Sequence, residues 1–167
     1  MTEKKLTEVH GAGATRRLQT RTTVNAPIET VWDALTKIEH VKGWWADGNL
    51  GSAVGEPVQL GGEEDLNGSI VAFMKPHVFE FTWHDDLSLA EHPEWIEPAT
   101  NSLVHFDLIE LGAESTLLTL ISFTPVASMI GAAAGWHHLF EMLKSYVETG
   151  DASTTDDRFE QLKALYA

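Results

Sequence analysis

The spacing of the apolar residues changes near Pro125, and this change constrains the fold more than any other feature of the chain. Over residues 57–123 apolar and polar residues alternate, which is typical of strands with one buried face. Beyond Pro125 the apolar residues recur at helical spacing, and Gly150 ends the pattern. The sequence therefore predicts an antiparallel β meander followed by one helix of about five to six turns. The apolar stripe of this helix holds Ala132, Trp136, Phe140, Leu143 and Val147.

The residues before the meander predict one strand and two short helices. Residues 15–24 alternate as a strand with a weakly apolar face does. Asn25 and Pro27 form a helix start signal, and the apolar residues after them recur at helical spacing as far as Ile38. A second short helical turn then leads into a loop that is dense in glycine.

Strands and one long loop are expected within the meander. The clearest strand is 78–83, in which Phe79, Phe81 and Trp83 share one face. The stretch 84–98 has five acidic residues, no Lys or Arg, and prolines that interrupt regular structure, so it predicts a long loop. The remaining strands are expected at residues 58–60, 68–73, 104–108 and 115–123.

These elements form one unit, because neither a repeat nor a linker divides them. We expect a flexible leader at residues 1–14, a single domain at 15–150 and a C-terminal tail at 151–167. One or two further helical turns around Phe159, Leu162 and Leu165 stay open for the tail. Because the tail is polar as far as Phe159, its removal is expected to leave the fold intact.

Net charge and cysteine content exclude several classes of partner. The net charge of −14 repels phosphate backbones and anionic lipids, so neither nucleic acid nor a membrane surface is expected as a partner. The chain has no cysteine, which excludes disulfides and sulfur-ligated zinc and fits a cytoplasmic location. No apolar run has the length of a signal-peptide core or of a membrane-spanning helix.

No local motif argues for catalysis, a metal or a cofactor. The sequence GAGATR at 11–16 lacks the third glycine of a dinucleotide fingerprint and precedes a strand instead of following one. His84 and His92 lie among acidic residues, but no spacing typical of a metal site joins them, and the adjacent His137 and His138 point about 100° apart on a helix. We therefore predict no catalytic residue, no metal ligand and no cofactor.

The aromatic residues are the most distinctive side chains of the sequence. Six tryptophans are many for this length, and several aromatic residues fall on faces predicted to point inward. Any one of these residues is explained by a well-filled core. Together they also fit a pocket, because a curved sheet around a helix leaves space between the two. The expected cavity is lined by Trp45, Phe79, Phe81, Trp83, Phe106, Leu108, Trp136, His137 and Phe140.

The order of these motifs resembles the family of homologues of the activator of heat-shock-protein ATPase (Aha-type), in the START-like (SRPBCC) superfamily. The resemblance covers roughly residues 17–150 and is carried by VNAPIETVWDALTKIEHVKGWW, by Gly68 opening a strand, by KPHVFEFTW and STLLTLISF, and by AAGWHHLFEMLKSYVETG. It implies a helix-grip α+β fold, as in birch-pollen-type allergens. A curved antiparallel sheet of six to seven strands then surrounds the long C-terminal helix, with two short helices after the first strand.

Three functions remain open for such a domain. The leading hypothesis is binding of a small apolar or aromatic ligand between the sheet and the last helix. The second is a protein-interaction module of the co-chaperone type, with a chaperone or a second copy of the chain as partner. The third is a cyclase- or dehydratase-like enzyme, for which His137 and His105 are the candidate polar groups.

Overall fold

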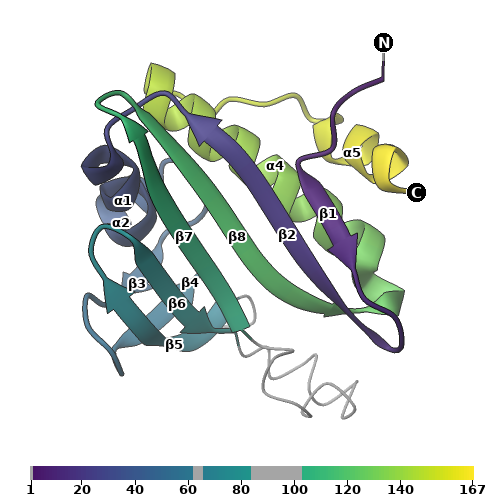
Figure 1. The fold of residues 1–167 in the computed structure, drawn as a ribbon, viewed down its shortest axis with the longest axis horizontal. Coiled ribbons are helices and arrows are strands. Elements are labelled where there is room, and N and C mark those ends of the chain that lie inside the picture. The colour runs from purple at the N-terminus through teal and green to yellow at the C-terminus, as the bar shows by residue number, and fades with distance from the viewer. Residues whose placement is uncertain (1, 62–65, 84–102) are drawn as a thin grey trace.

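The computed structural model describes residues 2–61, 66–83 and 103–167, and these residues form one antiparallel sheet with helices on one side (Figure 1). The strand order is β1-β2-β8-β7-β6-β5-β4-β3. The strands are β1 (Thr7–His10), β2 (Thr15–Val24), β3 (Gly48–Leu50), β4 (Pro57–Leu60), β5 (Leu66–Met74), β6 (Val78–Thr82), β7 (Leu103–Gly112) and β8 (Ser115–Pro125). The helices are α1 (Ile28–Thr36), α2 (Ile38–Val41), the 3-10 turn η3 (Val126–Ser128), α4 (Met129–Thr149) and α5 (Arg158–Tyr166).

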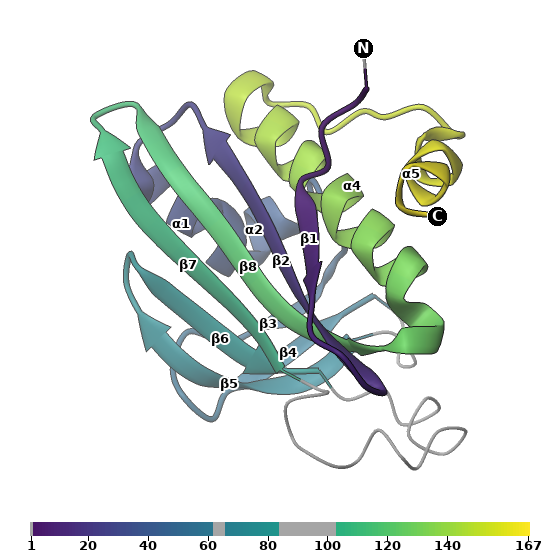
Figure 2. The ribbon, with the colours of Figure 1, turned by 45° about the vertical axis from the view of Figure 1, so that its right-hand side comes forward.

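The sheet curves around α4, as the two ribbon views show together (Figures 1 and 2). α4 packs against β1, β2 and β8, and α1 and α2 lie near its C-terminal end. This arrangement confirms the expected helix-grip α+β fold. The sheet has eight strands instead of six to seven, because the short strands β1 and β3 extend its two edges.

The central pairing joins segments that are far apart in the chain. β2 pairs with β8 along its whole length, from Thr15 opposite Pro125 to Val24 opposite Thr116. The predicted alternation is confirmed here, because Leu18, Thr20 and Val24 are buried on the face toward α4. The long loop expected at 84–98 lies outside the described residues.

Two short helices follow β2, as predicted, and they separate at Lys37. The backbone of Lys37 is extended, which ends α1 before α2 begins. α1 buries Val31, Trp32 and Leu35 in the core. The indole of Trp44 then ties the end of this region to α1, because its Nε1–H donates to the carbonyl oxygen of Ala34 over 2.8 Å.

The two ends of the chain are more ordered than the expected leader and tail. Part of the expected leader is β1, which pairs with β2 from Thr7 opposite Thr20 to His10 opposite Arg17. Part of the expected tail is α5, which packs on α4 and buries Leu162 completely. The apolar residues of so short a helix are too few to mark it in the sequence, and most of its stability comes from packing on α4.

The apolar side chains on the concave side of the sheet form the core together with α1 and α4. The largest fully buried side chains are Trp32, Phe79, Phe81, Phe106 and Phe140. Among the described residues, no helix has both the length and the apolar character that crossing a membrane requires.

Candidate functional site

Three tryptophans from three separate elements meet beside the core. Trp45 follows α2, Trp83 follows the last residue of β6, and Trp136 lies on α4. Their ring centroids are 5.8 Å apart for Trp45 and Trp136, 5.8 Å for Trp83 and Trp136, and 6.1 Å for Trp45 and Trp83. Trp45 and Trp83 are only partly buried. We call Trp45, Trp83 and Trp136 the tryptophan cluster.

The phenylalanines of the expected cavity form a continuous stack behind this cluster. Phe79 and Phe106 are stacked with centroids 6.3 Å apart, and Phe106 and Phe140 are stacked at 6.4 Å. Phe81 contacts Phe79 at 5.2 Å, and each of these four rings is at most 2% exposed. Leu108 is also buried in the same core. These side chains pack on one another between the sheet and α4.

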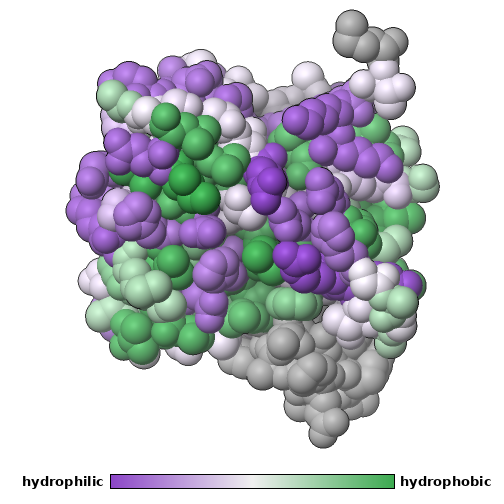
Figure 3. Space-filling model, viewed as in Figure 1, coloured by the Kyte–Doolittle hydropathy of each residue, from purple (hydrophilic) through white to green (hydrophobic). Residues whose placement is uncertain are grey.

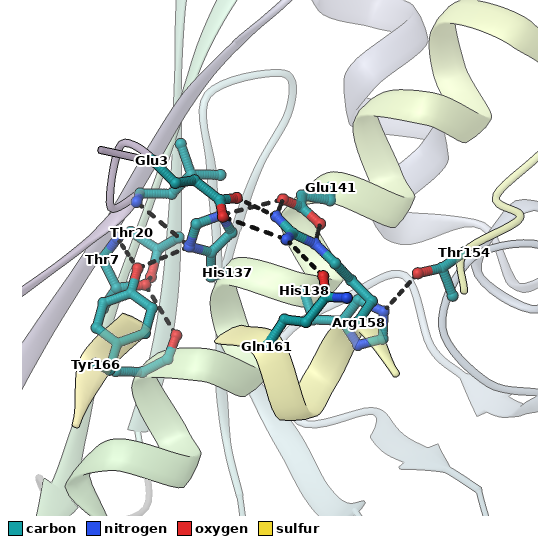
Figure 4. Close-up of polar contacts among 12 residues, drawn as sticks. Glu3, Thr7, Thr20, His137, His138, Glu141, Thr154, Arg158, Gln161 and Tyr166 are labelled. Carbon is teal, nitrogen blue, oxygen red and sulfur yellow. Dashed lines mark hydrogen bonds and ion pairs between the residues drawn. The ribbon is translucent and has the colours of Figure 1, made fainter. Parts of the chain in front are cut away.

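His137 lies apart from the tryptophan cluster, because it is turned about 100° around α4 from Trp136. It is 2% exposed and joins a polar cluster at the junction of β1, α4 and α5 (Figure 4). The hydroxyl of Tyr166 donates to its Nδ1 over 2.8 Å, and the backbone N–H of Leu6 approaches the same atom at 3.5 Å. Since Nδ1 accepts, the proton is on Nε2, which donates to Glu141 over 3.1 Å. His137 was expected to line the cavity, but two of its three hydrogen-bond partners, Leu6 and Tyr166, come from near the two ends of the chain.

Arg158 completes this polar cluster by joining two carboxylates. Its guanidinium donates to Glu141 on α4 and to Glu3 near the N-terminus (Figure 4). Burial alone would raise the pKa of Glu141, but hydrogen bonds from Arg158 and His137 lower that pKa to about 2. The hydrogen bond from Arg158 also lowers the pKa of Glu3, and the bond to Glu141 raises the pKa of Arg158. We call Glu3, His137, Glu141, Arg158 and Tyr166 the terminal clasp.

Three members of the terminal clasp have the side chains of a metal site. One ligand atom each of Glu3, His137 and Glu141 lies within 4.8 Å of the others. The guanidinium of Arg158 is hydrogen-bonded to both carboxylates, so a cation already occupies the position between them and offsets part of their charge. This geometry fits an ion-pair cluster better than a metal site. His84 and His92, considered as metal ligands in the sequence, lie outside the described residues.

His105, the other histidine considered for catalysis, lies on the outer face of the sheet. Its Nδ1 is 2.7 Å from Glu80 Oε2 on the neighbouring strand β6, and both side chains are about a quarter exposed. Exposed apolar side chains share this outer face, where hydrophobic and hydrophilic atoms are interleaved (Figure 3). The structure therefore brings neither His105 nor His137 to the tryptophan cluster.

Some contacts of the terminal clasp and of the tryptophan cluster can be predicted from the sequence, and others cannot. The four-residue spacing of His137 and Glu141 places both on one helix face, which is visible in the sequence. Their partners Arg158 and Tyr166 belong to a short helix whose docking position no local pattern specifies. The members of the tryptophan cluster were each predicted, but their mutual contact depends on how the loop after α2 folds back.

With this geometry established, comparison with known proteins identifies the family. The model of the family described as "Activator of Hsp90 ATPase homolog 1-like protein" matches residues 25–148. The chain belongs to this family. The match confirms the resemblance seen in the sequence, and it includes the whole region from α1 to the last turn of α4. No curated protein sequence matches the chain.

Solved structures of distant relatives share the fold. A conserved protein of unknown function from Enterococcus faecalis has a TM-score of 0.74 and 22% identity, over 96% of this chain and 87% of that one. CalU16 from Micromonospora echinospora has a TM-score of 0.68 and 20% identity, over 96% and 98%. The Aha1 dimer from Colwellia psychrerythraea has a TM-score of 0.66 and 16% identity, over 80% and 97%. At these identities the likeness shows the fold alone.

Proposed function

We propose that the chain binds a small apolar or aromatic molecule against the tryptophan cluster. The observation that carries this proposal is the mutual contact of three indoles from three elements, of which Trp45 and Trp83 remain partly exposed. Indole rings offer large flat apolar faces and contribute beyond the area that they bury when another ring packs on them. Aromatic side chains with a few polar groups are also the usual lining of small-molecule sites.

In this proposal the phenylalanine stack supports the site and does not open to the ligand. Phe79, Phe106 and Phe140 are stacked ring on ring and almost fully buried, so a ligand that entered between them would have to separate them. Separating packed rings costs the dispersion contacts that hold a close-packed core together. The ligand therefore contacts Trp45, Trp83 and Trp136, and the phenylalanines stay packed in the core.

Binding of the neutral fluorescent probe N-phenyl-1-naphthylamine tests this proposal. We expect one probe per chain, with quenching of tryptophan emission. Trp83→Leu should weaken binding about two- to tenfold, which corresponds to the roughly 0.5–1.5 kcal/mol of an aromatic pair. Urea unfolding of the variant establishes that it remains folded.

Phe159→Leu is the matched control, because it removes another partly exposed aromatic ring, on α5 beside His138. This variant should bind the probe as the parent chain does. The proposal is wrong if the parent chain does not bind the probe, or if the two variants weaken binding equally.

A second candidate function, association with another copy of the chain, rests on the outer face of the sheet. Met74 on β5 and Ile109 on β7 point away from α4 and are 58% and 49% exposed. Val71 and Leu111 add further exposed apolar surface on the same two strands. Apolar surface of this kind marks many interaction sites, and the relative from Colwellia psychrerythraea was solved as a dimer.

A further inference from the structure

A cavity lies beside the C-terminal half of α4. It is on the other side of this helix from the terminal clasp. It has a volume of about 320 Å³ and is bounded by α1, α2 and the last turn of α4. This volume is at the lower end of the range of small-molecule sites, so only a small ligand fits it. Its lining residues are Thr30, Asp33, Ala34, His40, Tyr146, Val147 and Gly150.

The cavity combines a carboxylate with the negative end of a long helix. The carboxylate of Asp33 lines the cavity and is partly exposed, and its buried Oδ1 has no hydrogen-bond partner among the described residues. Its other oxygen, Oδ2, is 3.2 Å from Lys37 Nζ, but both side chains are partly exposed, and such surface pairs are weak. Tyr146, Val147 and Gly150 all line the cavity, so the C-terminal end of a 21-residue helix lies at it. The last turn of α4 contains no basic residue that would balance this dipole.

The opposite wall is a polar aromatic surface. The hydroxyl of Tyr146 and Nδ1 of His40 are hydrogen-bonded over 2.8 Å, and their rings meet edge to face with centroids 6.0 Å apart. Tyr146 has little room to move toward α2, because a Cβ on Gly43 would lie 2.6 Å from its ring. A fixed phenol ring offers a large apolar surface to the alkyl part of a ligand.

From these contacts we propose that the cavity binds a small organic ammonium ion. The ammonium pairs with the partly exposed carboxylate of Asp33, lies at the C-terminal end of α4, and has its alkyl part against Tyr146 and Val147. An anion is excluded by the same features, because the carboxylate and the helix end both repel it. The site is distinct from the tryptophan cluster, so this proposal does not depend on the proposed function.

Calorimetric titration with cyclohexylammonium, compared with the neutral isostere cyclohexanol, tests the proposal. We expect one ammonium ion per chain, no measurable binding of the alcohol, and weaker binding at higher ionic strength. Asp33→Asn keeps the shape of the side chain and should weaken binding about ten- to a hundredfold, because it removes the charge from the acceptor. Asp107→Asn is the matched control, since it removes the same charge from a half-buried position on the outer face of the sheet, and it should change affinity less than about twofold.

Amide chemical shifts of the parent chain locate the bound ion independently of any variant. The amides of Thr30, Asp33 and Gly150 should shift on titration, and that of Trp83 should not. The proposal is overturned if cyclohexylammonium does not bind, if cyclohexanol binds equally well, if the two Asn variants weaken binding to the same extent, or if the shifts lie elsewhere.

Discussion

Truncation of Leu162 tests whether α5 is an integral part of the folded domain. Leu162 is fully buried against α4, whereas the sequence predicts a removable tail over residues 151–167. Leu→Ala at a buried site costs about 2–5 kcal/mol, and the cost depends on how far the surroundings collapse. α5 is a nine-residue helix near the end of the chain and can settle onto a smaller side chain. We therefore expect Leu162→Ala to lower the free energy of unfolding by about 2 kcal/mol.

Urea unfolding, followed by circular dichroism and by tryptophan emission, measures this loss. With a slope of about 2 kcal/mol per M, the midpoint should fall by roughly 1 M. Leu165→Ala is the control, because the same truncation three residues later removes a half-buried side chain and should cost about half as much or less. Hydrogen exchange of the α5 amides separates local detachment of the helix from loss of global stability. Docking of α5 would be refuted if Leu162→Ala changed neither the midpoint nor the exchange of these amides.

Two further predictions concern charge and the outer face of the sheet. The pKa of Glu141 is about 2 in the folded chain against an ordinary value of 4.5. A lowered pKa contributes stability above pH 4.5, and this stability is lost as the pH falls toward 2. Urea midpoints over this interval should therefore decrease more steeply for the parent chain than for Glu141→Gln. Equal slopes would contradict this. If the exposed apolar face mediates self-association, Ile109→Lys should shift the chain toward monomer in analytical ultracentrifugation. Lys42→Ala, a change at an exposed position on the helical side, should not. An unchanged sedimentation coefficient of the Ile109→Lys variant would exclude this face.

The sheet-and-helix architecture was predictable because burial imposes a period on the sequence. Phe79 and Phe81 alternate with polar residues since only one face of β6 meets the core, and Phe140 recurs four residues after Trp136 since only one stripe of α4 does. For the same reason β1 was missed, and the residues of α5 were assigned to a removable tail. Four residues are too few to display a period, and α5 places a single fully buried residue, Leu162, against α4.

The candidate sites were likewise predictable only where local spacing determines the position of a side chain. Local spacing predicted that Trp83, Phe106 and Trp136 face inward, but it could not tell a ligand site from rings that fill space with one another. His137 was also expected to line the cavity, although its position on the helix left both sides open. The hydrogen bonds of His137 go to Leu6, Glu141 and Tyr166, and two of these three partners come from the extreme ends of the chain. Such long-range partners are set by tertiary docking and leave no trace in the spacing of neighbours.

The pairing of β2 with β8 also determines when the sheet can close during synthesis. Leu18 lies opposite Ser122, so after β2 has been made the ribosome must add about 100 more residues before its partner exists. At roughly 5–20 residues per second, β2 waits at least about 5 s with one edge unpaired. An open edge of this kind is a template for pairing with other chains. The rate of translation between β2 and β8 should therefore influence how much of the nascent chain reaches the native sheet and how much is lost to aggregation.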